Sequence, residues 1–75
     1  MQKLSETKTG ETAFISVVEG DTRFLSRITS IGLTIGSQIS VIQNVKKRPL
    51  LIYSRDTIIS LNKEECRKIM VEVRA

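Results

Sequence analysis

Residues 24–36 read FLSRITSIGLTIG, and this stretch decides the fold because it predicts one amphipathic helix in a chain otherwise rich in strand-forming residues. The apolar side chains that recur at helical spacing, and that we expect on the core side, are Phe24, Leu25, Ile28 and Ile31. Arg23, Arg27 and Ser30 lie on the opposite side, which predicts a solvent-facing surface. The pattern therefore predicts a helix at about Thr22 to Ile31.

Both ends of this helix are marked by its own sequence. Asp21 comes just before the apolar periodicity, where its carboxylate can accept hydrogen bonds from the free N–H groups of the first turn. Gly32 follows the last periodic residue, at the position where a left-handed conformation commonly ends a helix and disfavours a Cβ atom. A second glycine, Gly36, stands four residues later, at the expected entry to a strand.

The rest of the chain predicts short strands separated by turns. The expected strands are residues 12–18, 38–45, 50–54, 58–61 and 70–73. Pro49 can only start or edge a strand, and residues 55–57 predict a hairpin turn in which Asp56 tolerates a positive φ. Asn62 is followed three positions later by Glu65, a capping-box variant that predicts a short helix before the last strand.

Five short strands with one inserted helix predict an all-β fold of small size, a closed or nearly closed barrel in which strand edges are paired. Residues 1–75 are expected to form a single domain, because a chain of this length has one simple core. The residues by themselves leave two architectures open, an SH3-like barrel and an oligonucleotide-binding barrel.

Composition suggests where the protein works. No segment reaches the ~18 apolar residues of a membrane helix, and residues 1–8 have no apolar stretch of signal-peptide type. The single cysteine, Cys66, forms no internal disulfide, which fits a reducing compartment. We expect a cytoplasmic protein that is not inserted in a membrane.

The side chains that usually carry catalysis or bind metals are scarce. The chain has no histidine, so the commonest general base near neutral pH is missing. One cysteine without histidine does not supply a zinc or ferrous site, and residues 32–36 lack the length and the Lys-Ser or Lys-Thr pair of a phosphate loop. Cys66 is interpreted as a small core residue. We therefore expect no enzyme activity, no catalytic or metal residues, no cofactor and no small-molecule substrate.

The net charge of +4 raises the question of an anionic partner. Lys46, Lys47 and Arg48 form a basic cluster in the loop before Pro49. The chain has few aromatic residues on which bases could stack, which argues against nucleic acid. The cluster is interpreted either as a solvated loop or as a docking site for an acidic partner.

The chain resembles the ferrous iron transport protein A (FeoA) family. Its signature Leu-x-x-Met-Gly-Leu-x-Pro-Gly is similar to Ile28–Gly36, with Ile35 in place of the proline. Residues 48–61 are similar to the family's Asp-Pro…Arg-Gly…Leu-x-Leu segment, with Asp56 in place of the glycine, and residues 65–71 are similar to its Glu-Ala-x-x-Ile-x-Val close. The resemblance spans Leu4 to Val73. It implies a small SH3-like barrel of about five strands, with one amphipathic helix after the first strand and a short helix before the last.

The resemblance also implies a function. It is that of an accessory protein of bacterial ferrous iron uptake, which acts on the cytosolic domain of the FeoB membrane transporter, a GTP-binding protein. We expect the partner to contact the helix face, the loop between the two glycines, and the basic loop. The candidate contact residues are Arg23, Arg27, Leu33, Ile35, Lys46, Lys47 and Arg48. A stand-alone regulatory domain, like the module fused to metal-dependent repressors, and a small basic RNA-binding barrel are the alternatives.

Overall fold

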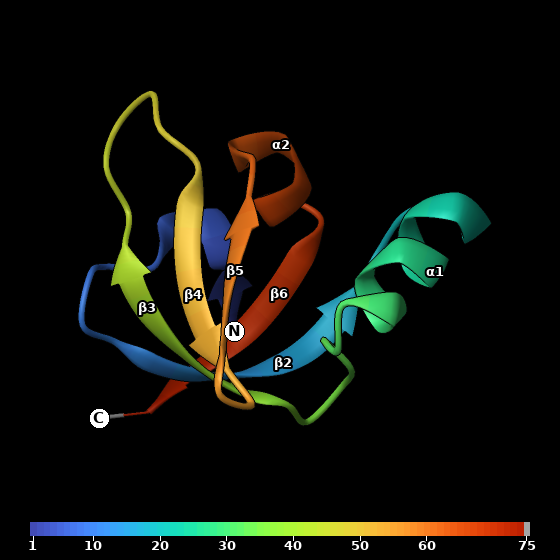
Figure 1. The fold of residues 1–75 in the computed structure, drawn as a ribbon, viewed down its shortest axis with the longest axis horizontal. Helices are drawn as coiled ribbons and strands as arrows, with labels where there is room; N and C mark the ends of the chain where they lie inside the picture. The colour runs from blue at the N-terminus through green and yellow to red at the C-terminus, as the bar shows by residue number, and fades with distance from the viewer. Residues whose placement is uncertain (75) are drawn as a thin grey trace.

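The fold is one strongly curved antiparallel sheet with two short helices (Figure 1). It comes from a computed structural model that describes residues 1–74. The strands are β1 (Gln2–Lys3), β2 (Thr12–Val18), β3 (Gln38–Gln43), β4 (Leu50–Ser54), β5 (Thr57–Leu61) and β6 (Ile69–Arg74), and the helices are α1 (Thr22–Ser30), α2 (Lys63–Cys66) and the 3-10 turn η1 (Leu4–Glu6). The strand order is β1-β6-β2-β3-β4-β5.

Two bulges allow so short a sheet to curve. The register between β2 and β6 shifts between Ile15 and Val17, and the register between β3 and β4 shifts between Val41 and Gln43. A bulge adds one residue to one strand, increases the twist and bends the strand. The curved sheet forms the small SH3-like barrel that the family resemblance implied, and β1 is a sixth strand that the sequence did not indicate.

The core fills the inside of this barrel and draws on nearly every element. Its buried apolar side chains include Leu4, Ile15, Ile28, Leu33, Ile39, Val41, Leu50, Ile52, Leu61, Ile69 and Val71. In β4 the residues Leu50, Ile52 and Ser54 are buried and alternate with more exposed residues, and in β5 only Ile59 and Leu61 are buried, as expected for strands with one face inside. The bulge in β2 changes this alternation, so that Val17 is exposed and Val18 packs against the core.

The predicted strands agree with the structure apart from small shifts of their ends. The predicted bounds of β2 and β4 are confirmed, whereas β3 ends at Gln43 and not at residue 45. The reason lies in Asn44, whose side-chain amide donates to the carbonyls of Ser5 and Thr7 and so ties the start of the loop to the N-terminal segment. The β4–β5 turn is confirmed, with φ of 51° at Arg55 and 62° at Asp56.

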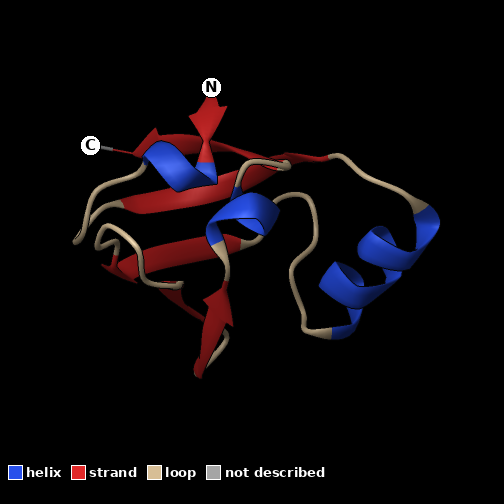
Figure 2. Cartoon of the chain, turned by 90° about the horizontal axis from the view of Figure 1, so that it is seen from above, coloured by secondary structure: helices blue, strands red, loops and turns tan. Residues whose placement is uncertain are grey.

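Helix α1 projects from one side of the barrel, while α2 lies over the strands when the molecule is seen from above (Figure 2). The prediction of which α1 side chains face the core is confirmed for two of the four residues. Phe24 and Ile28 are buried, but Leu25 and Ile31 are exposed, because the barrel covers only a narrow strip of this projecting helix. Within residues 1–74, neither helix has the length and apolar run needed to cross a bilayer.

Candidate protein-binding surface

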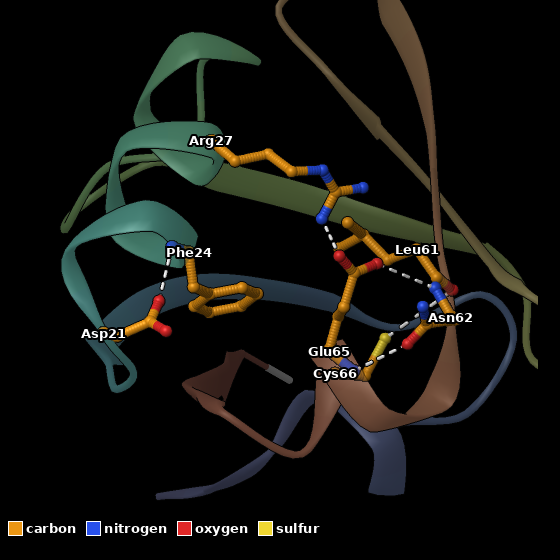
Figure 3. A network of polar contacts seen from close by, with 7 residues as sticks. All are labelled: Asp21, Phe24, Arg27, Leu61, Asn62, Glu65 and Cys66. Atoms are coloured by element: carbon orange, nitrogen blue, oxygen red, sulfur yellow. Dashed lines mark hydrogen bonds and ion pairs between the residues drawn. The ribbon is translucent and has the colours of Figure 1, made fainter.

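Helix α1 is fixed at its first turn by a capping residue and an aromatic anchor. The backbone N–H of Phe24 donates to Oδ1 of Asp21 at 2.9 Å, which confirms Asp21 as the N-cap (Figure 3). The Phe24 ring is buried, and the Lys68 amine lies 4.7 Å from its centroid. A cation over an aromatic face is attracted by the ring quadrupole. The start of α1 is therefore held against the segment that links α2 to β6.

An ion pair joins the middle of α1 to α2. The Arg27 guanidinium contacts Oε2 of Glu65, and Oε1 of the same carboxylate accepts from the backbone N–H of Asn62 at 3.2 Å (Figure 3). The Asn62 side chain in turn accepts from the N–H of Glu65 at 2.8 Å, which confirms the predicted capping box. The structure therefore uses Arg27, a candidate partner contact, to join the two helices.

The hydrogen bonds at the C-terminal end of α1 determine where Gly32 and Leu33 lie. Gly32 has φ of 93°, and its N–H donates to the Thr29 carbonyl, while the N–H of Leu33 donates to the Ile28 carbonyl. This pair of bonds is a Schellman motif, which commonly places the residue after the glycine against the helix. Leu33 is accordingly buried in the core beside Ile28. The expectation that Leu33 is exposed in this loop is wrong, and its contact with a partner stays a prediction.

Ile35, in contrast, is 73% exposed. Its loop is held in place because the N–H of Gly36 donates to the Ile15 carbonyl at 2.7 Å, and the N–H of Thr34 donates to Oγ of Ser37 at 3.1 Å. An exposed apolar side chain on a fixed loop is a feature of binding surfaces.

A groove of about 540 Å³ lies between α1 and this loop. It is lined mainly by apolar side chains, namely Val18, Leu25, Ile28, Leu33 and Ile35, with Thr29 and Thr34. We call it the α1 groove. The sequence missed Leu25 as a groove residue because its helical spacing assigned it to the core. The signal for Leu33 was present, since an apolar residue directly after a C-terminal helix glycine is typical of the Schellman motif.

The remaining candidate contacts fall in two places. Arg23 is exposed on α1, whereas Lys46, Lys47 and Arg48 are exposed in the loop between β3 and β4. Figure 1 shows this loop at the upper edge of the molecule, away from α1 and from the loop that follows it. The structure thus separates the predicted contact residues into two surfaces.

Two titratable side chains in the described part of the chain have a pKa that their surroundings raise. Cys66 is fully buried, and this burial raises the pKa of its thiol to about 11. The Tyr53 hydroxyl donates to Oδ1 of Asp56 at 2.8 Å, and this bond raises the pKa of Tyr53. Among residues 1–74, no group of three or more Cys, Asp or Glu side chains is placed to hold a metal ion.

Fold and site together define a small SH3-like barrel with an apolar groove beside its longer helix. The sequence profile of the FeoA domain matches residues 2–73. The chain belongs to the FeoA domain family.

Two relatives show how this domain occurs in other proteins. The chain is 31% identical over 72 residues to the putative Fe(2+) transport protein A of Methanocaldococcus jannaschii, covering 96% of this chain and 87% of that protein. It is 39% identical over 72 residues to a Fe(2+) transport protein A/Fe(2+) transporter FeoB fusion protein of Porphyromonas gingivalis, covering 95% of this chain but 8% of that much longer protein.

Solved structures share the fold. The crystal structure of an iron uptake regulatory protein (FeoA) matches with a TM-score of 0.91 over 96% of both chains, at 24% identity. A manganese-dependent transcriptional repressor complex with manganese matches with a TM-score of 0.87, at 17% identity, over 97% of this chain and 36% of the repressor. At this low identity, the likeness to the repressor concerns the fold alone.

Proposed function

We propose that this protein is a cytoplasmic accessory protein of ferrous iron uptake that binds the cytosolic domain of a FeoB-like membrane transporter. The observation that carries the proposal is the Porphyromonas gingivalis relative, in which a segment 39% identical to this chain belongs to a fusion with the transporter FeoB. Two domains joined in one polypeptide are held at a high effective concentration of each other, which favours their association.

The α1 groove is the proposed place of contact. Its lining is mostly apolar, and Ile35 at its rim has 73% of its surface exposed. Covering such a side chain in a complex contributes about 1.5–3 kcal/mol. Arg23 is exposed on the same helix but does not line the groove, so it is a peripheral charge. The fixed loop conformation lowers the entropy lost when a partner binds.

The test compares two exposed isoleucines. Ile35→Asp is expected to weaken binding to the purified cytosolic domain of the transporter by about tenfold or more, because a buried apolar anchor is lost and a charge is left in its place. Ile58→Asp is the matched control, since Ile58 is 63% exposed on β5 and does not line the groove. Both variants are expected to keep the circular dichroism spectrum of the parent protein.

Rate measurements sharpen the test. Loss of an apolar anchor acts mainly on the dissociation rate, whereas loss of a peripheral charge such as Arg23→Gln acts on the association rate and its salt dependence. Equal binding by the parent, Ile35→Asp and Ile58→Asp proteins contradicts the α1 groove as the contact. Failure of the parent protein to bind the cytosolic domain contradicts the proposed function itself.

A further inference from the structure

One end of the barrel gathers basic side chains from two parts of the chain. The β3–β4 loop and α2 together form the upper edge of the molecule in Figure 1. We call this edge the basic end, and its cationic residues are Lys46, Lys47, Arg48, Lys63 and Arg67. Its acidic residues are Glu64 and Glu65, and Glu65 is already paired with Arg27. The basic end therefore carries a clear excess of positive charge.

The loop of the basic end is held in a defined shape. Nζ of Lys63 donates to the carbonyl of Val45 at 3.0 Å, and the N–H of Arg48 donates to the same carbonyl at 3.2 Å. The backbone N–H of Asn44 donates to Oγ1 of Thr9 at 3.1 Å at the start of the loop. Within residues 1–74, none of the three cations from Lys46 to Arg48 forms an ion pair. The fold thus presents three unneutralised charges on a fixed turn.

The chemistry of the basic end fits a lipid surface better than a nucleic acid or a protein. Tyr53, the exposed aromatic residue, lies next to the β4–β5 turn at the other end of the barrel, so bases have no stacking platform here. Three of the five cations of the basic end are lysines, a residue depleted in protein interfaces because its strongly hydrated ammonium resists desolvation. An anionic leaflet attracts such charges without stripping their water. Val45, 46% exposed beside them, adds an apolar side chain at the same surface.

We infer that the basic end docks on the anionic phospholipid headgroups of a membrane leaflet. None of the basic-end residues lines the α1 groove, so a protein partner in the groove and the membrane can be contacted at the same time. The inference does not depend on the proposed function, because lipid binding is expected of the isolated protein.

The test measures co-sedimentation of the whole protein with vesicles. Binding is expected to vesicles that contain phosphatidylglycerol and phosphatidylcholine, and not to vesicles of phosphatidylcholine alone. Each cation near an anionic leaflet strengthens binding by roughly fivefold, so Lys46→Gln/Lys47→Gln/Arg48→Gln is expected to reduce it by about 100-fold. Binding is also expected to fall as NaCl rises from about 0.01 M to about 0.15 M, since the Debye length shortens from roughly 30 Å to roughly 8 Å.

The control variant Lys3→Gln/Arg23→Gln/Arg55→Gln removes the same number of charges from outside the basic end. Each triple variant also changes one residue that has a positive φ, namely Lys47 with 65° and Arg55 with 51°, so any effect of this substitution on the backbone is similar in both. At about 0.15 M NaCl, where the Debye length is roughly 8 Å, the control is expected to bind within about threefold of the parent, because none of its three charges belongs to the basic end. Equal losses in both triple variants indicate attraction by net charge only and overturn the inference. So does an absence of parent binding to phosphatidylglycerol vesicles at low salt.

Discussion

Gly20→Ala tests how α1 is seated on the barrel. Gly20 has φ of 146°, and a Cβ atom built on it would lie 2.7 Å from Cδ2 of Phe24, with Cγ at 3.2 Å. A contact of this length forces either the glycine backbone or the buried ring to move. Because the Phe24 ring is the anchor of α1, its displacement is expected to loosen the helix and the α1 groove that the helix forms.

The cost follows from two separate effects. An alanine at this φ is strained by about 1–3 kcal/mol. Partial displacement of a buried phenylalanine adds a fraction of the roughly 3–5 kcal/mol that its complete truncation costs. The free energy of unfolding should fall by about 2–4 kcal/mol, a large part of the stability of a small domain. The melting temperature should fall by roughly 8–32 °C, at about 4–8 °C for each kcal/mol in domains of this size.

Urea denaturation followed by circular dichroism measures this loss, with Gly10→Ala as the control. Gly10 also has positive φ, 93°, but a Cβ atom there meets nothing within 4 Å. The control therefore carries strain without a clash and should cost less. Combining Gly20→Ala with Phe24→Leu isolates the contact, because the smaller side chain relieves the clash. The reasoning is refuted if Gly20→Ala costs no more than Gly10→Ala, or costs the same with Leu at position 24.

Three further predictions concern other parts of the molecule. Gly32→Val should destabilise the protein by more than about 1 kcal/mol in the same denaturation assay, because a β-branched residue is poorly tolerated at a φ of 93°; an unchanged midpoint contradicts this. The pKa of the buried Cys66 thiol is raised from 9.0 to about 11, so its contribution to stability is complete below pH 9 and is lost as pH rises toward 11. The parent should therefore lose stability over this pH range more steeply than Cys66→Ala, and equal slopes contradict burial of the thiol. Calorimetric titration with ferrous iron under reducing conditions should show no sub-micromolar site in the monomer, because histidine is absent and the one thiol is buried; stoichiometric tight binding contradicts this.

The sequence predicted well those features that depend on neighbouring residues. The cap of α1 at Asp21, the left-handed Gly32, the capping box of Asn62 and the turn at Asp56 are all present in the structure. Each involves groups no more than five residues apart, so the local order of side chains is sufficient to specify it.

The sequence predicted the candidate surface less well. It assigned Leu25 to the core and Leu33 to the surface, and the structure has both reversed. Helical spacing shows which side chains share a face, but the width of the covered strip depends on how far the barrel extends under α1. Strand β2 is a second example, because residue order alone does not reveal its bulge. The register shifts between Ile15 and Val17, at Ser16, and as a result Val18 packs against the core and Val17 does not.

By itself, the sequence determined the five longer strands to within two residues at each end, and the two α-helices with their caps, since these follow from propensities and hydrogen bonds within a few residues. Only the tertiary structure decided which residues act together. Arg27 meets Glu65 across the gap between the helices, and Asn44 reaches the carbonyl of Ser5, 39 residues away. Lys63 likewise fixes the basic loop through Val45, 18 residues earlier. The bulges and the strand order determine how the sheet curves. The curvature in turn determines which distant segments come within about 3 Å of each other, the distance at which a hydrogen bond forms.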